Sequence, residues 1–75
     1  MKIKFSRHAK RRAKLYNIPT EIIEKILEEK ELIQGNQEIV EDVQAFKYPL
    51  KIVVSVEGDI ITVITNYPLK RRRTK

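Results

Sequence analysis

The stretch that decides the fold of this 75-residue chain is residues 50–65, which read LKIVVSVEGDIITVIT. Two runs rich in β-branched residues, 50–57 and 60–65, lie on either side of Gly58-Asp59. A two-residue loop with glycine first is typical of a tight β-hairpin. The stretch therefore predicts two antiparallel strands joined by that turn.

The hairpin register predicts two different faces. In that register Val56 lies opposite Ile61, Val54 opposite Val63 and Ile52 opposite Thr65, all on one side. We expect this side to pack on helices. The other side carries Val53, Ser55, Thr62 and Ile64. It is only partly polar, and we expect a partner chain to be able to cover it.

Two helices are predicted upstream of the hairpin. Ser6 is a suitable N-cap for a helix that begins at Arg7, with a narrow apolar stripe formed by Ala9, Ala13 and Tyr16. Asn17 suits a left-handed position at its end. A second helix, with Thr20 as its expected N-cap, has a wide apolar face and should end near Lys30 or Glu31. The apolar face consists of Ile22, Ile23, Ile26 and Leu27.

The remaining segments complete a sheet. Residues 2–5 alternate polar and apolar side chains, as a short half-buried strand does. After a turn at Gly35-Asn36, Ile39, Val43 and Phe46 lie in a β-rich stretch that precedes Pro49. The expected fold class is α+β: a short N-terminal strand and two helices packed on a C-terminal antiparallel sheet of three to four strands. One domain, 1–69, is followed by a basic tail, 70–75, which we expect to be flexible.

Charge is divided unevenly along the chain. The net charge is +6, but residues 1–14 carry seven basic side chains and no acidic one, and residues 70–75 carry five more. The middle, 15–69, has four basic and ten acidic side chains. Such polarity favours a polyanionic partner, nucleic acid above all. Solubility, or a contact between basic ends and an acidic middle, is the alternative interpretation.

Composition also excludes several classes of site. The chain has no Cys and one His, which excludes disulfides, a thiolate zinc site and a histidine metal site. We predict no metal and no cofactor. Apolar runs reach only three or four residues, far short of a membrane span, and a cytoplasmic protein with no membrane partner is expected. High Glu, Lys and Ile content is typical of thermophile proteins.

The first helix resembles that of a known family. Ser6-Arg7-His8-Ala9-Lys10-Arg11-Arg12, followed by Asn17-Ile18, is similar to the Ser-x-His-Ala-x-x-Arg signature of a small domain family of unknown function in the RelE/ParE/BrnT toxin-like superfamily. Val63-Ile64-Thr65-Asn66-Tyr67 is similar to the Val-Val-Thr-x-Tyr ending of that family. Tyr16 stands where family members often carry Arg, so it cannot supply that guanidinium. The resemblance implies a RelE/ParE-like α+β fold and a superfamily that includes ribosome-dependent RNA-cleaving toxins and gyrase inhibitors.

Metal-free RNA cleavage needs proton transfer and cations near the phosphate. We predict His8 and Arg12 as catalytic residues, because imidazole titrates near neutral pH and a guanidinium binds phosphate through two donors. Arg11 is the alternative phosphate ligand, and Tyr48 the alternative to Tyr67 for stacking on a base. The predicted nucleic-acid-binding residues are Arg7, Lys10, Arg11, Lys14, Tyr67, Lys70, Arg71, Arg72 and Arg73. Structural roles for His8, for an ion-paired Arg12 and for the tyrosines are the competing interpretation.

Three functions are therefore expected in turn. The first is a toxin-like protein that binds RNA or the ribosome and cleaves RNA, with an acidic antitoxin protein as a second partner. The second is a non-catalytic binding module, either gyrase-inhibitor-like or a nucleic-acid-binding accessory protein. The third is a small structural homodimer. The first hypothesis requires the two basic blocks to converge on one surface.

Overall fold

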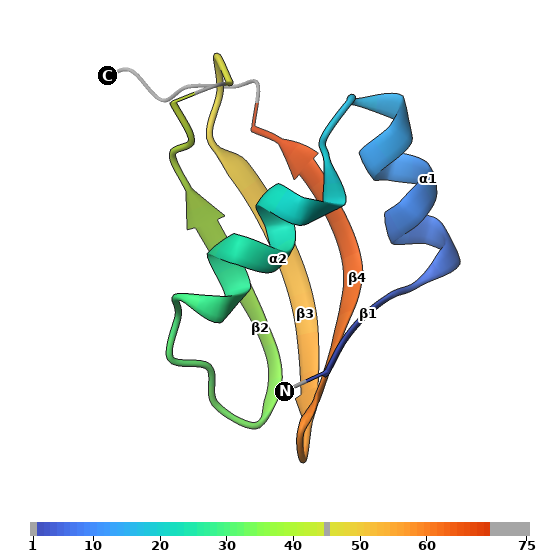
Figure 1. The fold of residues 1–75 in the computed structure, drawn as a ribbon, viewed down its shortest axis with the longest axis vertical. Coiled ribbons are helices and arrows are strands. Elements are labelled where there is room, and N and C mark those ends of the chain that lie inside the picture. The colour runs from blue at the N-terminus through green and yellow to red at the C-terminus, as the bar shows by residue number, and fades with distance from the viewer. Residues whose placement is uncertain (1, 45, 70–75) are drawn as a thin grey trace.

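Four strands form one sheet, with one helix across a face of it and another helix beside it (Figure 1). The computed structural model describes residues 2–44 and 46–69. Along the chain the elements are β1 (Lys2–Phe5), α1 (Arg7–Leu15), α2 (Thr20–Glu28), β2 (Gly35–Glu41), β3 (Leu50–Glu57) and β4 (Ile60–Pro68). The expected α+β class is confirmed. The tail, 70–75, lies outside the described residues.

The sheet is mixed, with the strand order β1-β4-β3-β2. β2, β3 and β4 pair antiparallel, as expected, and β1 adds to the edge of β4 in parallel. Ile3 lies beside Ile61 and Phe5 beside Val63. Because neighbouring residues of paired strands share a face, the alternation of residues 2–5 places their apolar side chains on the core side.

The hairpin register is confirmed at its turn and wrong further along. Gly58 has φ +59° and opens the two-residue loop, and Val56 pairs with Ile61 and Val54 with Val63. Ile52, however, pairs with Asn66 rather than with Thr65. The reason is a β-bulge, in which Ile64 is an extra residue between the partners of Val54 and Val53. One extra residue reverses the facing of all that follow, so Asn66 turns into the core.

The two helices begin differently. The hydroxyl of Ser6 accepts a hydrogen bond from the Ala9 N–H (3.0 Å), so Ser6 caps α1 as predicted. Asn17 has φ +56°, which confirms the left-handed position after α1. Thr20 is not a cap: it is the first helical residue of α2, and Pro19 occupies the cap position without a side-chain bond. The fixed φ of Pro19 suits an extended residue that enters a helix, and its carbonyl accepts from the Ile22 N–H (3.1 Å).

The core lies between α2 and the sheet. Ile23, Ile26 and Leu27 of α2 are buried, and Ile22 is half-buried against them. The sheet contributes alternate residues, all buried: Ile39, Leu50, Ile52, Val54, Val56, Ile61 and Val63. β2 ends at Glu41, so the predicted β-rich stretch up to Phe46 is a strand only in its first part. Val43 and Phe46 instead pack on the core from the connection to β3.

None of the helices in the described ranges has the length and apolar character needed to cross a membrane.

Candidate nucleic-acid interface

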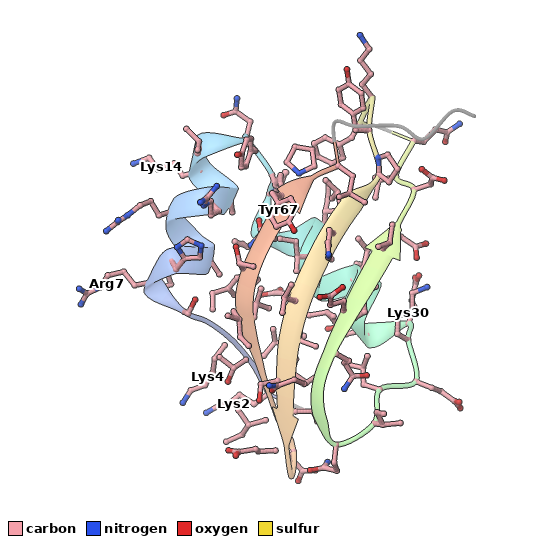
Figure 2. The ribbon with its side chains drawn as sticks, turned by 180° about the vertical axis from the view of Figure 1, so that it is seen from behind. Lys2, Lys4, Arg7, Lys14, Lys30 and Tyr67 are labelled. Atoms are coloured by element: carbon pink, nitrogen blue, oxygen red, sulfur yellow. The ribbon has the colours of Figure 1, made fainter. Side chains whose placement is uncertain are left out.

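One side of the sheet is left without a helix. Figure 2 views this side directly, with α2 behind the sheet and α1 at its edge. We call it the open face. Strand alternation assigns to it Lys2, Lys4, Glu38, Val40, Lys51, Val53, Ser55, Thr62, Thr65 and Tyr67. The central residues Val53, Ser55 and Thr62 are only half-buried. The open face is therefore a polar surface interspersed with small apolar side chains, as the hairpin predicted.

Cations lie on the half of the open face that is nearest to α1. Lys2 and Lys4 project from β1, below α1 in Figure 2. Lys51 of β3 lies opposite Tyr67 of β4, and Figure 2 shows Tyr67 on this side of the sheet. An aromatic ring beside ammonium groups is the combination that binds an unstacked base and its phosphate.

Lys51 is held as a cation. Its Nζ lies 3.1 Å from Oε1 of Glu38, across the neighbouring strand β2. The hydrogen bond and the charge of Glu38 raise the pKa of Lys51 above its usual 10.5, and the nearby Tyr67 phenol adds to this. Lys51 can therefore attract an anion at neutral pH, but Glu38 already occupies part of its hydrogen-bonding capacity.

The basic residues of α1 lie on two flanks. With Ala9 and Ala13 buried against β4, a spacing of 100° per residue puts His8, Arg12 and Leu15 on one flank and Lys10 and Lys14 on the other. α1 rises from Arg7 to Lys14 beside β4 in Figure 2. A right-handed helix in that orientation turns the flank of His8 and Arg12 toward the viewer, hence toward the side of the open face.

Arg12 and His8 differ in how they are held. Arg12 is half-buried, and its Nη1 donates a hydrogen bond to the Tyr16 hydroxyl (3.3 Å), one turn further along α1. This bond directs the guanidinium along the flank and leaves other N–H donors available. His8 is exposed, and none of the hydrogen bonds found among the described residues involves its imidazole. The sequence prediction that Arg12 pairs with an acidic residue is not what the geometry shows.

The structure brings together only part of the predicted site. His8, Arg12 and Tyr67 share one side of the molecule. Arg7 and Lys14 point away from the sheet in Figure 2, and Lys10 lies on the far flank of α1. Arg11 is exposed on the outer surface of α1. Lys70, Arg71, Arg72 and Arg73 lie outside the described residues, so the predicted convergence of the two basic blocks applies only to the flank of His8 and Arg12.

Sequence reasoning missed Lys4 and Lys51 as members of this surface. The signal was present for Lys51, because the hairpin register places it close to Tyr67 on the face away from the core. For Lys4 it was absent, since pairing of β1 with β4 depends on the tertiary fold. Tyr48, the other candidate for stacking, is half-buried before β3, with Lys47 Nζ 5.7 Å from the centre of its ring.

The described residues contain no group of three or more acidic or histidine side chains that could hold a metal ion. Comparisons with protein-family models, with curated proteins and with solved structures gave no match to the chain. The fold and the surface therefore define the protein only as an α+β domain with a partly basic open sheet face.

Proposed function

We propose that this protein is a toxin-like RNA-binding protein that cleaves RNA on the open face and the adjoining flank of α1. The observation that carries the proposal is that His8 and Arg12 from α1 share one side of the molecule with Tyr67 and Lys51 from the sheet. A proton-transfer group, two cations and an aromatic ring are the parts that metal-free RNA cleavage needs.

Each residue has a role in this proposal. His8 takes the proton from the ribose 2′-hydroxyl, the 2′-oxygen attacks the phosphorus, and the 5′-oxygen leaves with a proton from solvent. Arg12 binds the phosphate and stabilises the charge that grows on its oxygens. Tyr67 stacks on a base, and Lys51 binds a neighbouring phosphate, since its raised pKa keeps it protonated.

The test is incubation with RNA, with and without ribosomes, for the protein and matched variants. His8→Ala should abolish cleavage and leave binding nearly unchanged, whereas Lys10→Ala, on the other flank of α1, should cleave normally. Arg12→Ala should weaken binding more than Lys14→Ala does. Binding should fall steeply with salt, because each neutralised phosphate releases counterions. Cleavage undiminished by His8→Ala would remove the proposed role of that residue.

A second function, a non-catalytic RNA-binding module, is favoured by one observation. The exposed imidazole of His8 has no described partner that orients it, and a general base usually depends on such a partner. In a binding module the cations of the open face matter and His8 does not. Expression of the protein and of His8→Ala separates the two functions. Growth arrest that is insensitive to His8→Ala, together with intact RNA binding, supports the binding module.

A further inference from the structure

The first turn of α1 is joined to β4 at the bulge by a set of polar contacts. The backbone N–H of Ser6 donates to the Val63 carbonyl (3.0 Å), and its hydroxyl donates to the Ile64 carbonyl (2.9 Å). The Nδ2 of Asn66 donates to the Ala9 carbonyl (3.2 Å). His8, the proposed catalytic base, lies between the two α1 residues that make these contacts.

Asn66 is an unusual residue for its place. It is fully buried, the one buried polar residue of the described chain, and its Oδ1 accepts no hydrogen bond there. A buried amide with only part of its hydrogen bonds destabilises a fold relative to an apolar side chain of the same size. Core packing by itself therefore gives no reason for asparagine at this position.

The apolar contact between α1 and the sheet does not define the position of α1. The buried residues of α1 are Ala9 and Ala13, whose single methyl groups form a smooth stripe. Interlocking of large side chains normally determines how a helix is rotated against its neighbour, and alanines provide little of it. Directional hydrogen bonds are an alternative that selects one arrangement among several apolar ones.

We infer that Asn66 is the positioning residue that holds α1 in one rotation against β4 and so aims His8 and Arg12 toward the open face. The bulge is part of this arrangement. Without the extra residue Ile64, alternation would turn the Asn66 side chain to the open face, out of reach of Ala9. The effect on RNA rests on the proposed function, whereas the effect on α1 does not.

Hydrogen exchange tests the inference without RNA. We compare the protein with Asn66→Leu, which keeps the size and removes the donor, and with Asn66→Ala, which adds no atom that could clash. Thr65→Val is the matched control, since it removes a polar group from the adjacent residue on the open face. The amides of Lys10 to Ala13 should exchange about tenfold faster in both Asn66 variants, relative to β3 amides of the same molecule. They should be unchanged in Thr65→Val.

The second readout separates positioning from general stability. The Asn66→Leu variant should melt no lower than the parent, because it removes a poorly bonded buried amide, yet its RNA cleavage rate should fall about tenfold at a constant folded fraction. Protection of α1 equal to that of the parent in a folded Asn66 variant overturns the inference. Loss of that protection with normal RNA cleavage supports the positioning of α1 and instead contradicts the proposed function.

Discussion

Replacement of Ser6 by alanine tests how α1 is attached, and the structure provides a magnitude. The Ser6 hydroxyl makes two hydrogen bonds: it accepts from the Ala9 N–H (3.0 Å) as the N-cap and donates to the Ile64 carbonyl (2.9 Å). Loss of an N-cap costs about 0.5–2 kcal/mol. The second bond is exposed to water, which can replace it, so it adds no more than about 0.5 kcal/mol. We expect Ser6→Ala to lower the free energy of unfolding by about 1.5–2 kcal/mol.

Thr20→Ala is the matched control, because the sequence suggests the same role for both residues. Thr20 is the first helical residue of α2 and makes no capping bond, so its replacement should change the free energy of unfolding by less than about 0.5 kcal/mol. Ser6→Thr keeps a hydroxyl acceptor and should recover most of the loss.

The assay is urea and thermal unfolding followed by circular dichroism. In a domain of this size the expected loss corresponds to a fall of roughly 6–15 °C in the melting temperature of Ser6→Ala. The dependence on urea should keep its slope, since the surface exposed on unfolding is the same. If Ser6→Ala and Thr20→Ala are equally harmful, or both harmless, the described capping geometry is wrong.

Three further predictions concern the sheet. Ile52 is fully buried on the central strand β3, so Ile52→Val should lower the free energy of unfolding by about 0.5–1.5 kcal/mol in urea titrations, with no change in secondary structure. Gly58 has φ +59° with nothing within 4 Å of an added Cβ, so Gly58→Ala should cost roughly 1–2 kcal/mol from backbone strain alone, and Gly58→Asn, a residue that tolerates this conformation, should cost less by the same titration. Glu38 raises the pKa of Lys51, so the charged lysine stabilises the fold below pH 10.5, and this contribution disappears as pH rises through the raised pKa. An NMR titration should find the Lys51 pKa closer to 10.5 in Glu38→Gln, and an unchanged value would contradict the ion pair.

Local sequence signals predicted those elements whose geometry depends on near neighbours. Ser6 and Asn17 mark the two ends of α1 because a cap and a left-handed residue act within one turn. Leu50–Glu57 is a strand at the predicted bounds because alternation and a two-residue turn leave little choice of register near Gly58. Thr20 shows the limit of such reasoning: Pro19 precedes it and is just as able to begin a helix, and the residues alone do not rank the two.

The candidate site was predictable only in part, for the same reason. His8 and Arg12 share a flank of α1 because they are four residues apart, which any helix ensures. Whether that flank lies beside Tyr67 or on the opposite side depends on how α1 sits against β4. Arg7 and Lys14 belong to the same basic block, yet they point away from the sheet.

The sequence by itself determined the α+β class, the two helices, the hairpin and the division of charge between the ends and the middle. These follow from periodicity and turn chemistry, which act over a few residues. Only the tertiary structure decided that β1 pairs with β4, that a bulge at Ile64 turns Asn66 into the core, and that Lys51 joins Tyr67 on the open face. Each of these depends on contacts between residues far apart in the chain, and a single extra residue in a strand is enough to reverse which side chains face the core.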